Sequence, residues 1–98
     1  MQLDTEFVRA QFPAFSEPNL QGQSFFENAG GSYACGAVID RLERYYRQRK
    51  VQPYAPYEAS RLAGEEMDEA RERLSAMLGV AQDELSFGPS TTQNTYVL

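Results

Sequence analysis

The chain has 98 residues, 42% of them hydrophobic and 23% charged, a balance typical of globular proteins and not of disordered, collagen-like or low-complexity ones. Nine basic and fourteen acidic side chains give a net charge of −5, which disfavours binding to nucleic acid or to an anionic membrane. The absence of histidine excludes Ser-His and Cys-His nucleophile pairs and histidine-based metal centres, so we expect neither a metal site nor a catalytic residue of these kinds.

The N-terminal sequence and the cysteine content indicate in which cellular compartment the protein is expected. No apolar run reaches the roughly 20 residues that cross a bilayer, and residues 1–6 lack the basic flank and the apolar core of a signal peptide. The single cysteine, Cys35, cannot form an internal disulfide and suits a reducing environment. We therefore expect a soluble, cytoplasmic protein.

The first half of the chain predicts two helices and a short strand. Asp4 is a typical N-cap for a helix over residues 4–11, and Pro13 would end that helix. Residues 24–27 predict a strand that a glycine-rich turn closes. Residues 37–50 carry apolar side chains at three- and four-residue spacing and end in basic residues, which predicts a second helix.

The second half predicts a loop, a long helix, a strand and the start of another helix. Pro53 and Pro56 place a loop at residues 51–57, and Gly79 is suited to cap a helix over residues 58–78. Residues 84–87 predict a second strand, and Ser90 opens a helix that the chain does not finish. The expected buried stripe of the long helix comprises Ala63, Met67, Ala70, Leu74, Met77 and Leu78.

These elements predict an α/β fold that is mostly α, with two short strands. Two strands this short and this far apart make a poor sheet by themselves. We therefore expect the chain to be part of a larger α/β protein.

Two stretches could carry chemistry. Ser90, Thr91 and Thr92 follow a Gly-Pro turn at a helix start, where unpaired amides, the helix dipole and hydroxyl groups suit an anion such as phosphate. The same pattern fits a simple capping box, with Gln93 three residues after Ser90, and the local pattern favours the cap. Residues 27–31 similarly favour a plain turn, although their small side chains permit a ligand to approach the backbone.

Taken together, the two stretches resemble the class V aminotransferase group of fold-type I pyridoxal-phosphate enzymes, which includes the cysteine desulfurases. Residues 27–31, Glu-Asn-Ala-Gly-Gly, match that family's (D/E)NA(A/G)(T/G) motif, and residues 87–94 match its Gly/Ser-Thr-Thr motif at a helix start. A long helix closing in Leu-Gly lies between them, at the family's spacing. The resemblance spans roughly residues 7–98, and the Gly-Gly-Ser and Gly-Pro-Ser variants resemble the cysteine desulfurase-like branch most.

This resemblance implies a site and a domain organisation. Thr91 and Thr92 would bind the phosphate of pyridoxal 5'-phosphate, and Asn28, Ala29 and Gly30 would lie on the substrate side of that cofactor. Residues 1–98 would form a partial domain: residues 1–64 an N-terminal segment with small-domain and substrate-side elements, and residues 65–98 the start of the cofactor-binding large domain. An amino-acid substrate and a homodimer are also implied, whereas transamination, desulfuration and other α- or β-carbon reactions remain open.

The family's remaining cofactor-binding groups have no match in the chain. Its covalently binding lysine, its acidic partner for the pyridine nitrogen and its stacking ring all follow the Thr-Thr motif. Lys50, the only lysine, lies beside Arg47 and Arg49 and is interpreted as solvated. Cys35 suggests a persulfide-carrying nucleophile, but the family's catalytic cysteine lies far downstream, so we interpret Cys35 as a half-buried residue before a helix. We expect no catalysis by these 98 residues alone.

The sequence assigns no single role to several further residues. Tyr54 and Tyr57, in the proline-containing loop, could lie at a dimer interface or gate a substrate, and Arg61 matches a position where relatives often carry arginine. Tyr45 and Tyr46 are expected to pack on the apolar side of their helix. The competing interpretation is a small, α-rich, non-enzymatic interaction module whose exposed face is completed by a partner or by self-association.

Overall fold

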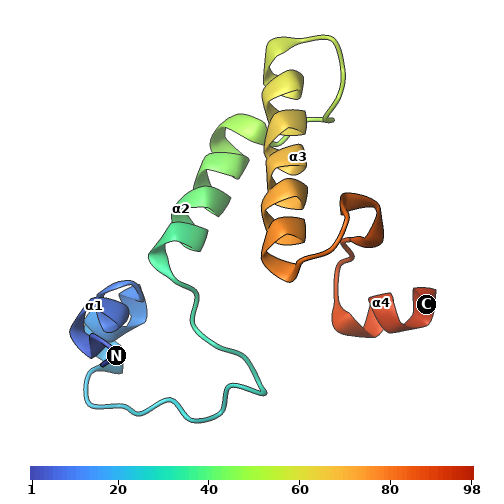
Figure 1. Ribbon diagram of the computed structural model, residues 1–98. Helices are drawn as coiled ribbons and strands as arrows, with labels where there is room; N and C mark the ends of the chain where they lie inside the picture. Colours follow the sequence, from blue (N-terminus) through green and yellow to red (C-terminus); the bar gives the residue numbers. More distant parts are fainter. The chain divides into compact units, whose positions relative to one another are not determined.

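A computed structural model describes all 98 residues, which form helices and connecting segments (Figure 1). The chain divides into two compact units, Met1–Lys50 and Val51–Leu98. The predicted boundary between residues 64 and 65 falls inside a continuous helix of the second unit.

The first unit contains two α-helices joined by turns and an extended segment. Helix α1 (Thr5–Ala10) begins as expected, because the Asp4 carboxylate accepts a hydrogen bond from the Phe7 amide at 3.0 Å. Two 3₁₀ turns follow, η1 (Pro13–Ser16) and η2 (Pro18–Leu20), each starting at a proline. Helix α2 (Gly36–Arg44) then continues into a single π-helical turn, η3 (Tyr45–Arg49).

The second unit is built on helix α3 (Glu58–Leu78), which has the predicted bounds. Gly79 caps it in the left-handed conformation, with φ 69° and ψ 33°, which favours glycine. After the 3₁₀ turn η4 (Gln82–Glu84), the chain reaches helix α4 (Thr91–Val97), whose N-cap is Ser90. Glu69 and Arg73 form an ion pair on α3, with 2.7 Å between the charged groups.

The α/β prediction is wrong, because the chain has no strand and no sheet. A strand exists only where its backbone groups pair with a neighbouring strand, and neither residues 24–27 nor residues 84–87 find one. The backbone of Leu85 bonds elsewhere: its amide donates to the Gln82 carbonyl, and its carbonyl accepts from the Arg71 guanidinium. Both predicted strands are therefore connecting segments in a helical chain.

The buried stripe predicted for α3 is also largely wrong. Ala63 is buried, but Met67, Leu78 and Met77 are 51%, 59% and 82% exposed. Helical spacing shows which side chains share a face, but what covers that face depends on other elements. In the whole chain, Ala14 and Ala63 are the only hydrophobic residues that are buried.

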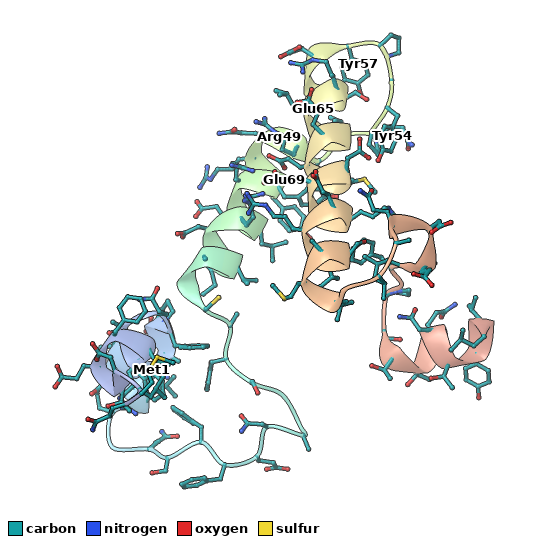
Figure 2. All side chains as sticks on the ribbon, viewed as in Figure 1. Met1, Arg49, Tyr54, Tyr57, Glu65 and Glu69 are labelled. Atoms are coloured by element: carbon teal, nitrogen blue, oxygen red, sulfur yellow. The ribbon has the colours of Figure 1, made fainter.

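The loop before α3 is held to that helix by a buried hydroxyl. Ser60 is fully buried, accepts a hydrogen bond from the Ala55 amide at 2.7 Å and donates to the Gln52 carbonyl. Between those two partners Tyr54 adopts φ 66°, a conformation that side chains other than glycine rarely take. Its hydroxyl donates to Asp68 at 2.7 Å, and Figure 2 shows its ring beside α3.

We expect Gly64→Ala to destabilise the second unit by about 1–3 kcal/mol, as overpacking does elsewhere. A Cβ at Gly64 would lie 2.8 Å from the Tyr54 ring. The ring could move aside only by breaking the hydrogen bond from its hydroxyl to Asp68. Urea unfolding followed by circular dichroism measures the change. In a Tyr54→Gly background the same substitution should become neutral or stabilise by up to about 1 kcal/mol, because alanine favours helix over glycine. The same loss in both backgrounds would contradict the packing explanation.

Ser60→Ala should cost about 1–3 kcal/mol in the same measurement, because it removes a fully buried hydroxyl and leaves the Ala55 amide and the Gln52 carbonyl without their partner. Ser75→Ala is the matched control. Ser75 is also buried, but its hydroxyl donates only to the Arg71 carbonyl within α3, so we expect a change below about 0.5 kcal/mol. Equal losses for the two variants would show that the loop contacts contribute little.

Candidate functional site

The turn before α4 forms as a cap that leaves two amides open. The Ser90 hydroxyl accepts a hydrogen bond from the Gln93 amide at 3.1 Å, and the Ser90 carbonyl accepts from Asn94 at 2.9 Å. The predicted cap is confirmed. The amides of Thr91 and Thr92 have no partner in the chain, and both residues are exposed. Two backbone donors and two hydroxyl groups therefore face solvent at the positive end of the helix dipole.

The Asn94 side chain of α4 lies close over Gly88. A Cβ built on Gly88 would lie 1.6 Å from the Asn94 side-chain oxygen, so a larger residue would fit only if that side chain moved away. The Asn94 side chain thus lies over the backbone just before Pro89 and Ser90.

The segment leading to the turn is attached to the middle of α3. The Arg71 guanidinium donates to the Leu85 carbonyl and lies 5.5 Å from the centre of the Phe87 ring. Between this segment and α4 lies a cavity of about 550 Å³, whose walls include Phe87, Asn94 and Val97 but not Thr91 or Thr92. The candidate phosphate donors therefore lie outside this cavity.

The Asn28–Gly30 stretch forms a tight, exposed turn. The Glu27 carbonyl accepts from the Gly30 amide at 3.3 Å, and the Asn28 carbonyl accepts from Gly31, whose φ of 140° suits glycine. The Ser32 hydroxyl donates to the Asn28 side-chain oxygen at 2.9 Å. This turn belongs to the first unit, whereas Thr91 and Thr92 belong to the second.

Cys35 and Lys50 have the exposure that the sequence predicted. Cys35 is half-buried and precedes α2, and its carbonyl accepts from the Val38 and Ile39 amides. Lys50 is exposed after the π-helical turn. No group of three His, Cys, Asp or Glu side chains comes close enough to hold a metal ion.

Tyr54, Tyr57 and Arg61 all lie where the loop meets α3. Figure 2 shows Tyr57 at the first turn of α3 and Tyr54 farther along the helix. Arg61 is paired with Glu58, 2.6 Å away, and with Glu65, and the hydrogen bond to Glu58 is the main cause that raises its pKa. Spacings of three and four residues could have predicted these pairs, but the fourteen-residue separation of Tyr54 and Asp68 gives no such signal.

Comparison of the chain with models of protein families, with curated proteins and with solved structures finds no match in any of the three. None of its helices combines the length and the apolar character that a membrane span requires.

We expect Tyr54 to titrate at a higher pH than the ordinary value of a tyrosine side chain. The hydrogen bond to Asp68 raises the pKa of Tyr54, and desolvation and the charge of that carboxylate raise it further. Because the neutral phenol is the form that donates, its stabilisation of the loop persists below pH of about 10 and is lost as pH rises through the raised pKa. Titration of tyrosines labelled with ¹³C at Cζ, followed by NMR, measures this directly.

Asp68→Ala should return the pKa of Tyr54 towards its ordinary value, whereas the control Glu72→Ala, one turn later on α3, should leave it unchanged. An unaltered Tyr54 titration in Asp68→Ala would contradict the assigned cause.

Proposed function

We propose that this chain supplies the phosphate-binding turn of a pyridoxal-phosphate-dependent enzyme that acts on amino acids, of the class V aminotransferase or cysteine desulfurase-like kind. One structural observation carries the proposal. Because Ser90 caps α4 with its own hydroxyl, the amides of Thr91 and Thr92 remain available beside their two exposed hydroxyl groups. A phosphate monoester needs this combination of donors, and the resemblance of residues 27–31 and 87–94 to the family supports the choice of cofactor.

The exposed amides and hydroxyl groups that open α4 suit the phosphate end of this cofactor. Thr91 and Thr92 would hold its phosphate through amide and hydroxyl hydrogen bonds, without any positive side chain in the first turn of α4. Asn28, Ala29 and Gly30 would lie towards the substrate, where small, exposed residues let an amino acid reach the backbone. When bound, pyridoxal phosphate supplies an electron sink for reaction at the substrate's α-carbon.

The proposal gives these residues a binding role and no catalytic one. The only lysine, Lys50, is exposed and follows a turn rich in arginine, so nothing here favours it as the group that reacts with the cofactor. The intact enzyme would be a cytoplasmic homodimer, with residues around Tyr54 and Tyr57 at the subunit interface. Transamination, desulfuration and other α- or β-carbon reactions are all compatible with a phosphate turn of this kind.

A second candidate function follows from the exposed apolar side chains of α2 and η3. Val38 and Leu42 on α2 are 55% and 54% exposed, and Tyr46 on η3 is 61% exposed. Such a face suits a non-enzymatic interaction module that docks on a partner. An exposed apolar face is equally compatible with a partial domain of an enzyme. Phosphate binding is therefore the property that distinguishes the two candidate functions.

Addition of pyridoxal phosphate or inorganic phosphate to the 98-residue chain should shift the NMR amide signals of Thr91, Thr92 and Gln93, with a Kd on the order of 1 mM. Pyridoxal, which lacks the phosphate, should not shift them. Thr91→Pro removes one amide at the first helical position, where proline is tolerated, and should weaken binding about tenfold.

Thr95→Ala is the matched control for this experiment. The Thr95 hydroxyl donates to the Thr91 carbonyl at 2.8 Å within α4, so its removal should leave phosphate affinity unchanged. Equal responses to pyridoxal and pyridoxal phosphate, or full affinity in Thr91→Pro, would overturn the assignment of the phosphate to this turn.

A further inference from the structure

The first unit contains a cavity of about 360 Å³ that is separate from the phosphate turn. It lies between η1 and the segment that leads into α2, and its volume falls within the range of about 300–1,000 Å³ typical of small-molecule sites. Its walls are formed chiefly by four aromatic rings and two polar side chains: Phe12, Phe15, Phe25, Tyr33, Asn28 and Ser32.

The four rings form a continuous series of edge contacts. Phe12 and Phe15 lie 6.5 Å apart between ring centres, Phe15 and Phe25 lie 5.9 Å apart, and Phe25 and Tyr33 lie 5.1 Å apart. Their planes meet at angles of 53° to 83°, so no pair is stacked face to face. Each ring is at least partly accessible, which leaves aromatic surface for a further ring to contact.

The cavity has one polar end and no charged wall. The Ser32 hydroxyl donates to the Asn28 side-chain oxygen, which leaves the Asn28 amide group free to donate and the Ser32 oxygen free to accept. The Arg9 guanidinium lies 3.9 Å from the centre of the Phe15 ring, and none of the residues that line the cavity is charged. A neutral polar group that both donates and accepts would find a partner for each role at Ser32 and Asn28.

The backbone holds the two sides of the cavity together. The Gly36 amide donates to the Gln11 carbonyl at 2.8 Å, which joins the start of α2 to the end of α1 and closes the segment that carries all four rings. The cavity is thus a feature of the ordered first unit and not of a single side-chain arrangement.

We infer that this cavity binds a small, neutral aromatic molecule that carries an amide or hydroxyl group. The aromatic ring contacts Phe15, Phe25 and Tyr33, and the polar group pairs with Asn28 and Ser32. The inference does not rest on the proposed function, because the cavity lies within the first unit and requires neither the cofactor nor Thr91 and Thr92. Asn28 is the one lining residue that it shares with the proposed substrate side.

Benzamide is a suitable probe, since it joins a phenyl ring to a neutral amide. Titration into the 98-residue chain should shift the NMR signals of Phe25, Tyr33 and the Asn28 side-chain amide in a saturable way, with a Kd on the order of 1 mM. Benzoate, which has the same shape but a negative charge, and cyclohexanecarboxamide, which lacks the aromatic ring, should each bind at least about fivefold more weakly.

The neighbouring residues Phe25 and Phe26 provide matched variants. Phe25 lines the cavity, whereas Phe26 is 90% exposed and does not line it. Phe25→Leu should weaken benzamide binding about tenfold, Ser32→Ala about threefold, and Phe26→Leu not at all. Circular dichroism shows whether each variant keeps its helices, and Ser32→Ala tests the site without altering the rings.

The inference is overturned if the shifts do not saturate, if they map outside the cavity, or if Phe25→Leu and Phe26→Leu bind equally well. Equal binding of benzamide and benzoate would also overturn it, because the assignment depends on a ligand group that donates as well as accepts, and benzoate has no donor.

Discussion

The hydroxyl of Ser60 joins the loop at residues 51–57 to α3. It accepts from the Ala55 amide and donates to the Gln52 carbonyl, so residues 51–57 are fixed against α3. With these two ends held, Tyr54 can occupy a left-handed conformation that costs free energy by itself, and its ring then lies against Gly64. The hydrogen bond to Asp68 completes the arrangement. This set of polar contacts organises the loop where an apolar core would do so in a larger domain, since Ala14 and Ala63 are the only buried hydrophobic residues.

A similar dependence on α3 applies to the candidate phosphate turn. Arg71, in the middle of that helix, donates to the Leu85 carbonyl and lies near the Phe87 ring. These contacts hold the backbone that leads into Gly88 against α3. Asn94 then covers Gly88 from α4, and Ser90 caps the helix. The direction in which the Thr91 and Thr92 amides point is therefore determined by a long helix rather than by the turn alone. For a site made of backbone donors this support matters, because such donors bind well only when they are held in place.

The features that the sequence predicted are those whose causes lie within a few residues. Asp4 and Ser90 as caps and Gly79 as the left-handed end of α3 all follow from local chemistry. The strands at residues 24–27 and 84–87 were wrong because pairing requires a second segment, and local composition does not reveal whether one is present. Burial of Met67 and Met77 was wrong for the same kind of reason. At the candidate site, the cap was predictable, whereas the position of Asn94 over Gly88 and the ring cavity at Phe25 depend on contacts that no short pattern encodes.

The spans of these contacts also bear on how the chain folds. In the second unit, the bonds from Tyr54 to Asp68 and from Arg71 to Leu85 each bridge 14 residues along or beside a helix. The bond from Gly36 to Gln11 in the first unit closes a longer loop without helical structure through most of its length. Short loops cost less chain entropy to close, and chains with local contacts fold faster. The second unit should accordingly acquire its structure before the aromatic segment of the first unit is closed, so that the Gly36 amide, which closes this segment, becomes protected from hydrogen exchange late.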